Sequence, residues 1–282
     1  MKASFSKYTL NFIRPGGTSR GVLTQKETYF ICLKADGRWG IGEAGLFRGL
    51  SADDRPDYET RLSSVCKALE AGSEGLLEAC REYPSIVFGL EQALRSLKSP
   101  NPFELISSRF LEGDPIPING LIWMGEQQFM QRQIEEKIEA GFRCLKLKIG
   151  ALDFESELQL LREIRRRFRP EDLEIRVDAN GAFSPGEALE KLETLSELAL
   201  HSIEQPIRAG QPGEMAELCA RTPLPIALDE ELIGCYYPEE KEALLDAIRP
   251  QYIILKPSLV GGITGSSEWI EAAERRRIGW WV

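Results

Sequence analysis

The segment CLKLKIG, residues 144–150, has the pattern of a buried strand with two lysines one residue apart. Because successive side chains of a strand point to opposite faces, Lys146 and Lys148 share one face, and Leu145 and Leu147 share the other. Burying an unpaired ammonium group costs free energy, and burying two like charges together costs more. The segment therefore predicts a polar site whose compensating charges come from elsewhere in the chain.

Strands and helices alternate around this segment from residue 115 onward. The predicted strands are 116–121, 144–149, 173–178, 200–204, 225–229 and 252–256, with another beginning at 278. The predicted helices lie near 126–140, 154–168, 185–198, 212–221, 238–247 and 265–276. This spacing predicts right-handed βαβ units and a parallel sheet. Six complete units and a seventh strand favour a (β/α)8-type TIM barrel over a doubly wound sheet.

The eighth strand of such a barrel is missing from these residues. A closed barrel requires it, so we expect the natural chain to be longer, with its tail disordered or cut. We therefore predict an α/β fold with a barrel domain at 114–282, incomplete at its C-terminal end.

Residues 1–113 have a different pattern and predict an α+β domain. Alternating segments occur at 7–13 and 27–44, and Asp36-Gly37 within the second is a strong hairpin signal. Helical patterns follow at 58–72 and 85–99. The sequence GIGEAG, from Gly40 to Gly45, matches a dinucleotide-binding motif, but it lies on the returning strand of a hairpin. Without a βαβ unit around it, we reject that interpretation.

Composition excludes several classes of function. The net charge of −9 argues against a general nucleic-acid binder, and no segment approaches the length of a membrane helix or a signal peptide. The six cysteines are scattered without a CxxC pair, which predicts reduced thiols and a cytoplasmic location. His201 is the only histidine, so a Ser-His-Asp mechanism or a multi-histidine zinc site is disfavoured.

Ionisable residues stand at the C-terminal ends of five successive predicted strands. They are Lys148, Asp178, Glu204, Asp229 and Lys256, separated by 30, 26, 25 and 27 residues. One such residue is usually a solvated loop edge or a helix cap. Five at the spacing of one β/α unit predict a shared site, because barrel active sites are built at this end of the strands.

The carboxylates and lysines of this group explain one another. Three converging carboxylates, Asp178, Glu204 and Asp229, require a cation, and oxygen ligands favour Mg²⁺, with Mn²⁺ as an alternative ion. Lys146 is about 6–7 Å along the strand from Lys148. Its charge is expected to lower the Lys148 pKa by about two units, producing a usable base. The predicted reaction is removal of a proton α to a carboxylate, with Mg²⁺ stabilising the enediolate.

The motifs that carry these residues resemble those of the enolase superfamily, in its muconate-lactonizing-enzyme branch. They are KLKIG (146–150), RVDANGAF (176–183), SIEQPI (202–207), ALDEEL (227–232) and ILKPSLVGG (254–262). The resemblance implies that residues 1–113 form a capping domain over the barrel. It also implies metal ligands at Asp178, Glu204 and Asp229, and acid/base lysines at Lys148 and Lys256.

Within that branch, three further segments resemble the o-succinylbenzoate synthases. They are RPGGTSRGVLTQKE (14–27), PSIVFGLEQAL (84–94) and INGLIWMG (118–125). The resemblance implies a carbon–oxygen lyase of menaquinone biosynthesis. Its small-molecule substrate would be 2-succinyl-6-hydroxy-2,4-cyclohexadiene-1-carboxylate, which loses water to give o-succinylbenzoate.

The same resemblance implies roles for individual residues. Lys148 would take the α-proton and protonate the departing hydroxyl on the same face, while Lys256 would stabilise the enediolate. Lys146, Arg176 and Asn180 would support the metal or the substrate. Segments 14–25 and 46–50 would form mobile loops that close over the pocket.

Three alternatives remain open at this stage. An N-acylamino acid racemase or dipeptide epimerase would keep every catalytic residue but would require Lys256 to exchange a proton. A Schiff-base aldolase would use Lys148 or Lys256 as an amine and would leave the three carboxylates unexplained. A non-catalytic metal-binding or ligand-binding barrel would need the pocket but not the paired lysines. The sequence does not indicate an oligomeric state.

Overall fold

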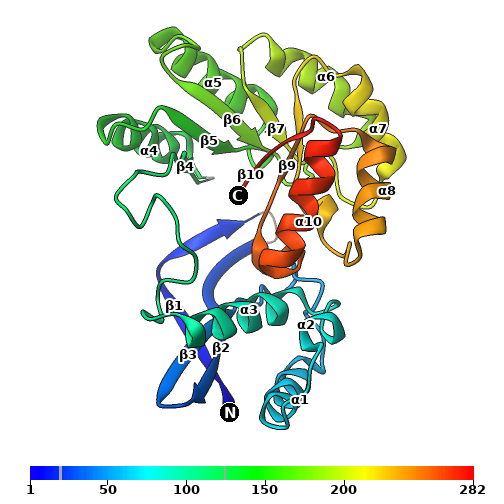
Figure 1. Ribbon diagram of the computed structural model, residues 1–282. Coiled ribbons are helices and arrows are strands. Elements are labelled where there is room, and N and C mark those ends of the chain that lie inside the picture. The colour runs from blue at the N-terminus through cyan, green and yellow to red at the C-terminus, as the bar shows by residue number, and fades with distance from the viewer. Residues whose placement is uncertain (19–20, 124) are drawn as a thin grey trace.

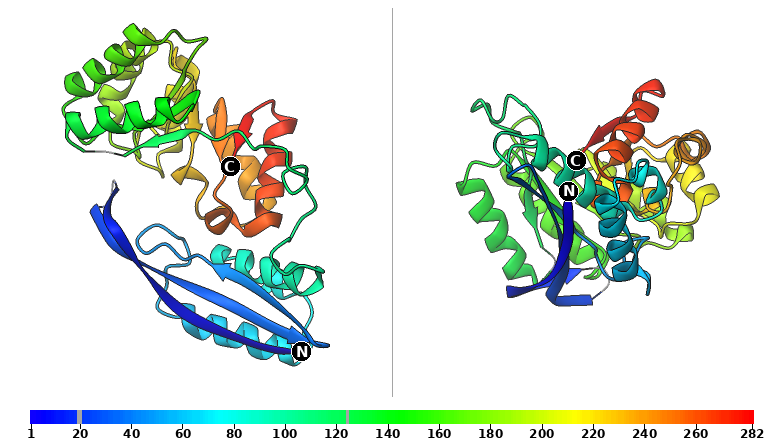
Figure 2. Two further views of the ribbon diagram at one scale, coloured as in Figure 1. Left: turned by 90° about the vertical axis from the view of Figure 1, so that its left-hand side faces the viewer. Right: turned by 60° about the horizontal axis from the view of Figure 1, so that its bottom comes forward.

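The computed structural model describes residues 1–18, 21–123 and 125–282. Its buried hydrophobic side chains form two separate cores. One core runs from Tyr29 to Ala93 and the other from Ile122 to Ile278. Figure 2 shows the N-terminal sheet and its helices on one side of the parallel sheet that follows. The predicted boundary between residues 113 and 114 falls between the two cores and stays a prediction.

An antiparallel sheet of three strands forms the first part of the chain. Its strands are β1 (Lys2–Thr18), β2 (Gly21–Ala35) and β3 (Arg38–Ala44), in the order β1-β2-β3. Asp36 and Gly37 connect β2 to β3 with φ angles of 50° and 77°. Positive φ at both positions is the requirement of a tight hairpin turn, so the hairpin predicted from Asp-Gly is confirmed.

Strands β1 and β2 are longer than the sequence analysis predicted. Residues 14–18 and 21–25 belong to these strands, rather than to the mobile loop expected between 14 and 25. Ser19 and Arg20, which that expectation included, lie outside the described residues. The pairing of β1 with β2 continues past a register shift between Asn11 and Gly16, so the backbone groups of this segment are used in the sheet.

Three helices accompany this sheet: α1 (Tyr58–Glu70), α2 (Leu76–Ala79) and α3 (Pro84–Lys98). Helices α1 and α3 agree with the predicted ranges within two residues. Helix α2 was not predicted, because four residues are too few to show a helical period. Helix α3 buries Ile86 and Leu90 in the same core as Ile31 and Leu33 of β2.

Two glycines allow α3 to approach β3 closely. A Cβ at Gly42 would overlap the carbonyl oxygen of Gly89 and would lie 2.6 Å from the Ala93 nitrogen. A Cβ at Gly89 would in turn lie 2.8 Å from the Ala44 nitrogen. Gly42 of GIGEAG therefore serves packing of a helix against a strand, which agrees with rejecting the dinucleotide motif.

We expect Gly42→Ala to lower the free energy of unfolding by about 1–3 kcal/mol, because the added methyl group has no room against the α3 backbone. The control is Gly186→Ala, where an added Cβ meets no atom within 4 Å. Denaturant unfolding of both variants measures the difference. Equal stabilities would contradict the packing role of Gly42.

A parallel sheet of seven strands forms the second part of the chain, in the order β10-β9-β8-β7-β6-β5-β4 (Figure 1). Its strands are β4 (Gly120–Ile122), β5 (Cys144–Lys148), β6 (Glu174–Asp178), β7 (Ser202–Glu204), β8 (Ile226–Leu228), β9 (Tyr252–Ile254) and β10 (Gly279–Trp281). The seven-strand prediction is confirmed. In the described residues the sheet is curled and open, a half-barrel with β4 and β10 at its edges.

The helices between these strands lie on the outer side of the curled sheet (Figure 1). They are α4 (Gln127–Glu139), α5 (Phe154–Arg167), α6 (Pro185–Ser196), α7 (Pro212–Arg221), α8 (Pro238–Ile248), α9 (Pro257–Val260) and α10 (Gly262–Arg275), with a 3₁₀ turn, η1, at Glu230–Leu232. Six of the helices match predicted ranges, and the short elements α9 and η1 were missed. Among the described residues, no helix has the length and apolar character that crossing a membrane requires.

The first strand of this sheet is shorter than predicted. The expected range was 116–121, whereas β4 covers Gly120–Ile122. Pro115 and Pro117 have no backbone N–H to donate, so they cannot contribute donors to a sheet ladder. Ile116 and Ile118 are exposed as a result.

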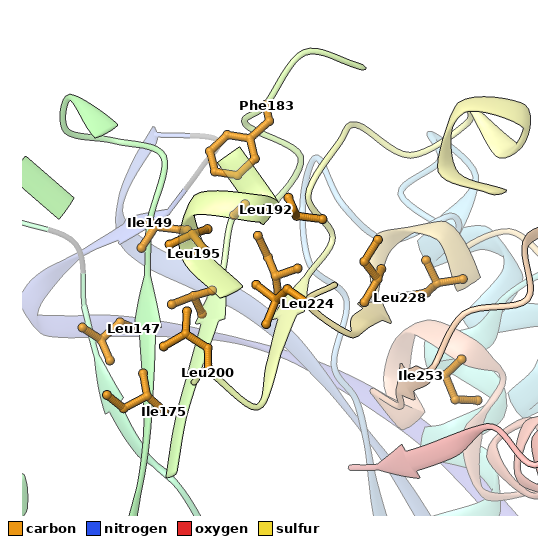
Figure 3. Packing of buried hydrophobic residues seen from close by; sticks show 14 of the residues in the cluster. Leu147, Ile149, Ile175, Phe183, Leu192, Leu195, Leu200, Leu224, Leu228 and Ile253 are labelled. Carbon is orange, nitrogen blue, oxygen red and sulfur yellow. The ribbon is translucent and has the colours of Figure 1, made fainter. Parts of the chain in front are cut away.

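The alternation predicted for the CLKLKIG strand is confirmed. Leu145 and Leu147 are fully buried and point outward to the helices, so Lys146 and Lys148 point to the inner side of the half-barrel. Figure 3 shows Leu147 and Ile175 of the sheet in one packed group with Leu192 and Leu195 of α6. The apolar face thus fixes the direction in which the lysines point.

Candidate active site

Strand register brings the predicted site residues to one level. Lys148 on β5 pairs with Asp178 on β6, and Asp178 pairs with Glu204 on β7. Each of the three is the last residue of its strand, Asp229 directly follows β8, and Lys256 follows β9. Because the strands are parallel, all five side chains emerge at the carboxyl edge of the sheet.

The lysines bridge the carboxylates at this edge. Lys146 Nζ lies 2.9 Å from Asp178 Oδ2 and also forms an ion pair with Glu204. Lys148 Nζ lies 2.6 Å from the same Asp178 oxygen. From the other side, Lys256 forms an ion pair with Asp229, and its Nζ lies 3.8 Å from Glu204 Oε1. The structure therefore brings the five predicted residues together with Lys146 in one charged group, in which the carboxylates are buried and the lysines are partly exposed.

Burial makes the charges of this group strongly interdependent. Asp178, Glu204 and Asp229 are 0%, 3% and 3% exposed. Burial, together with the charge of Asp178, raises the pKa of Glu204 to about 8. Although burial opposes it, the ammonium groups of Lys146 and Lys148 hold the pKa of Asp178 well below its usual range. Glu204 is thus the carboxyl group with the strongest need for a further cation.

The carboxylates of this group have the chemistry to bind a divalent cation. Glu204 Oε1 is buried and has no hydrogen-bond partner in the described part of the chain. The three carboxylates offer only oxygen ligands, the donor type that Mg²⁺ prefers. However, within residues 1–18, 21–123 and 125–282, no three Asp, Glu, His or Cys side chains are positioned so that they could bind one metal ion together. The lysine ammonium groups lie between the carboxylates, so binding a metal requires them to move.

Lys146 has partners that the sequence argument did not anticipate. The sequence predicted an unpaired Lys146 ammonium group whose charge would repel that of Lys148. In the structure, burial lowers the pKa of Lys146, but the charges of Glu204 and Asp178 outweigh burial and raise it overall. Lys146 is thus held as an ammonium group by its own carboxylates. The role of Lys148 as the base stays a prediction.

Asn180 connects three members of the site, as a supporting role requires. Its Oδ1 accepts a hydrogen bond from Lys148 Nζ at 2.7 Å, and its backbone N–H donates to Asp178 Oδ1 at 3.0 Å. Its Nδ2 donates to Glu230 Oε1 at 3.0 Å. A φ of 44° at Asn180 turns the chain sharply after β6, a conformation that asparagine tolerates better than most residues.

Sequence reasoning missed Glu230 and Gln205. Burial and the neighbouring Asp229 raise the pKa of Glu230, whose side chain faces the cavity. The adjacent acidic residues in ALDEEL were the available signal. Gln205 is fully buried, and its Oε1 accepts hydrogen bonds from the N–H groups of Asp229 and Glu231 at 3.2 Å. It therefore fixes the turn that presents Asp229 after β8.

Arg176 has a different environment from the one expected. Its Nε donates to Glu174 Oε1 at 2.6 Å, and its guanidinium carbon lies 4.2 Å from the centre of the Trp281 ring. Glu174 lies at the opposite end of β6 from Asp178, and in the described residues Arg176 forms no ion pair with any of the three carboxylates. A supporting role of Arg176 toward the metal or the substrate stays a prediction.

A cavity of about 510 Å³ opens above the charged group, between the carboxyl edge of the sheet and the N-terminal part of the chain. Lys146, Lys148, Asn180, Glu230 and Lys256 line one side of it. The other lining residues are largely apolar and include Phe47, Leu50, Phe88, Leu121, Trp123 and Leu259. The arrangement suits an anionic small molecule with an apolar body.

Comparison with known proteins identifies the family. Residues 129–282 match the family described as Enolase C-terminal domain-like. The chain belongs to the enolase superfamily. This half of the chain contains every residue of the charged group described above.

Similarity within the superfamily covers the whole chain. The o-succinylbenzoate synthase of Desulfotalea psychrophila is 48% identical, over 100% of this chain and 85% of that protein. A crystal structure of MenC from Desulfotalea psychrophila LSv54 has a TM-score of 0.88 at 44% identity, covering 100% of this chain and 85% of that one. This similarity identifies an enzyme of the carbon–oxygen lyase class.

A more distant relative shares the fold. The o-succinylbenzoate synthase structure from Thermosynechococcus elongatus BP-1, with Mg in its active site, has a TM-score of 0.79 at 20% identity. It aligns with 96% of this chain, which covers 81% of that one. This chain therefore shares with that structure the arrangement of the N-terminal sheet and the curled parallel sheet.

Adding Mg²⁺ is expected to raise the thermal unfolding midpoint of this superfamily member, because a ligand that binds the folded state stabilises it by about 2.7 kcal/mol at a hundredfold excess over Kd. Glu204→Gln should abolish the shift, since it removes the carboxylate with the unpartnered oxygen. Glu174→Gln, at the opposite end of β6 from Asp178, should retain it. A shift that survives Glu204→Gln, or no shift in the parent protein, would contradict metal binding by this group.

Proposed function

We propose that this protein catalyses the Mg²⁺-dependent syn dehydration of 2-succinyl-6-hydroxy-2,4-cyclohexadiene-1-carboxylate to o-succinylbenzoate, a step of menaquinone biosynthesis. The observation that carries the proposal is the convergence of lysines from two sides on one carboxylate group. Lys148 reaches Asp178 from β5, and Lys256 reaches Asp229 from the end of β9. The 48% identity to an o-succinylbenzoate synthase supports the choice of substrate.

Asp178, Glu204 and Asp229 would hold Mg²⁺, which supplies positive charge to the oxygens of the enediolate when it is bound. These carboxylates lie on three adjacent strands, so the sheet itself fixes their spacing. Asn180 and Gln205 keep the turns after β6 and β8 in place through the hydrogen bonds described above.

Lys148 is the proposed base. Its amine takes the proton from the carbon α to the ring carboxylate, and the electrons of that C–H bond move into the enediolate. The enediolate then re-forms the carboxylate and expels the hydroxyl group, which receives the proton from Lys148 and leaves as water. The same group on the same face performs both transfers, which accounts for a syn elimination. The hydrogen bond to Asn180 Oδ1 holds Nζ in position.

Lys256 is the proposed charge stabiliser. Burial lowers its pKa, but the charges of Asp229 and Glu204 outweigh burial and raise it. An amine held in its protonated form suits electrostatic stabilisation of the enediolate better than proton removal. The proposal therefore assigns the stabilising role to Lys256.

An absorbance assay of aromatic product tests the proposal. With the diene acid and Mg²⁺, we expect turnover by the parent protein and a loss of at least about 100-fold in kcat for Lys148→Ala, the lower end of general acid–base contributions. Lys67→Ala, an exposed lysine of α1, is the control and should be unaffected. If the parent protein forms no product, the proposed reaction is wrong.

Racemisation or epimerisation is the second candidate, because lysines on two sides of one site could exchange protons on both faces of a substrate. Incubating N-acyl amino acids and dipeptides in D₂O separates the two activities. We expect no inversion of configuration, since Lys256 has the neighbours of a charge stabiliser. Deuterium at the α-carbon with inversion, in a protein that does not dehydrate the diene acid, would favour the epimerase.

The remaining expectations concern partners and location. A small-molecule carboxylate is the proposed ligand of the cavity. The six cysteines lie within the described residues and are all free there. A cytoplasmic location and the exclusion of nucleic acid as a partner stay predictions.

A further inference from the structure

A fourth lysine faces the cavity from the side opposite the charged group. Lys26 of β2 lines it together with Glu43 of β3 and Gly45, which directly follows β3. These residues come from the N-terminal sheet, whereas the proposed catalytic residues come from the parallel sheet. The cavity therefore has an ammonium group on each wall, a carboxylate on the same wall as Lys26, and apolar lining residues that include Phe47 and Phe88.

The Glu43 carboxylate has a hydrogen-bond partner, whereas the Lys26 amine has none among the described residues. Glu43 Oε1 accepts a hydrogen bond from Thr28 Oγ1 at 2.6 Å, and Thr28 is fully buried. Among the residues that the structure describes, Lys26 Nζ forms neither a hydrogen bond nor an ion pair. Burial lowers the Lys26 pKa, and the charge of Glu43 only partly opposes this. A partly buried ammonium group without a close partner indicates that a ligand supplies one.

Gly45 leaves Lys26 open to the cavity. A Cβ at Gly45 would lie 3.8 Å from Lys26 Nζ, 3.8 Å from Glu43 Oε1 and 3.9 Å from Ser258 Cβ. Ser258 is two residues beyond Lys256, so Gly45 lies near both the amine of Lys26 and the wall that carries the proposed catalytic residues. Lys26 can therefore contact the far end of a ligand whose near end lies at the carboxylate group.

We propose that Lys26 binds a second carboxylate of the substrate and so selects dicarboxylates. The inference rests on the proposed function, because the succinyl chain of that substrate ends in a carboxylate remote from the ring carboxylate. The apolar lining between the two walls accommodates the ring and the methylene groups. The alternative is a lysine whose stem packs on the wall and whose amine only contacts water.

Three variants separate these two roles. Lys26→Met keeps the length of the side chain and removes the charge, and Lys26→Arg retains a cation. Lys34→Met is the matched control, because Lys34 is an exposed lysine on the same face of β2 and does not line the cavity. The thermal unfolding midpoint of each variant shows whether the fold is intact.

Calorimetric titration with two ligands in the presence of Mg²⁺ tests the contact itself. The ligands are o-succinylbenzoate and 2-butyrylbenzoate, which differ by replacement of the chain carboxylate with a methyl group. We expect the parent protein to bind o-succinylbenzoate about 10- to 100-fold more tightly, the range for one hydrogen bond between charged groups. Lys26→Met should bind the two ligands about equally, Lys26→Arg should recover part of the preference, and Lys34→Met should retain it.

Steady-state kinetics then distinguish this inference from the proposed function. With the diene acid, Lys26→Met should raise KM about 10- to 100-fold and leave kcat within about threefold, since the contact is remote from the reacting carbon. A parent protein that prefers o-succinylbenzoate but does not dehydrate the diene acid would refute the proposed function and not the role of Lys26. A preference that survives Lys26→Met, or a parent protein that does not distinguish the ligands, would overturn that role.

Discussion

The burial of lysines and carboxylates together at one end of a parallel sheet is the constraint on which the rest of the structure depends. Strands β6, β7 and β8 deliver carboxyl groups that are almost fully buried, and β5 and the end of β9 deliver ammonium groups that bridge them. Neither set could be buried alone, because unpaired charges in a protein interior are costly. The charge of Glu204 is not fully compensated: its pKa is raised to about 8, and its Oε1 has no hydrogen-bond partner among the described residues. A divalent cation would complete it and would release lysines for chemistry.

The fold supplies this arrangement through packing on the opposite face of the sheet. Leu145 and Leu147 are held against the outer helices, and that contact determines where Lys146 and Lys148 point. The N-terminal sheet then covers the carboxyl edge and adds Lys26 to the cavity wall. Its position depends on close contact between β3 and α3, which Gly42 and Gly89 permit. Glu91 of α3 also accepts hydrogen bonds from the Thr264 N–H at 3.0 Å and from the Ile263 N–H at 2.5 Å, joining the N-terminal part to the start of α10.

Periodicity and spacing were sufficient to predict the strands, the main helices and the five strand-end residues, because each follows from local pattern and from the length of a β/α unit. The contacts that determine side-chain direction were not predictable in this way. Arg176 shares the face of Asp178 but turns to Glu174 and Trp281, and Trp281 is distant in sequence. Lys146 was expected to act on Lys148, yet it is paired with Glu204, whose partners depend on the register of three strands. Gln205 acts through backbone groups beyond β8, a contact that no local pattern reveals.

The central claim is that a divalent cation takes the place that the lysine ammonium groups hold between the three carboxylates. A crystal structure of the protein with Mg²⁺, repeated with Mn²⁺ for its anomalous signal, tests this claim most directly. The account predicts one ion with an oxygen from each of Asp178, Glu204 and Asp229 at about 2.0–2.1 Å for Mg²⁺, with Lys146 and Lys148 displaced from Asp178 Oδ2. An ion bound elsewhere, or lysines that still bridge the carboxylates at saturating Mg²⁺, would contradict it.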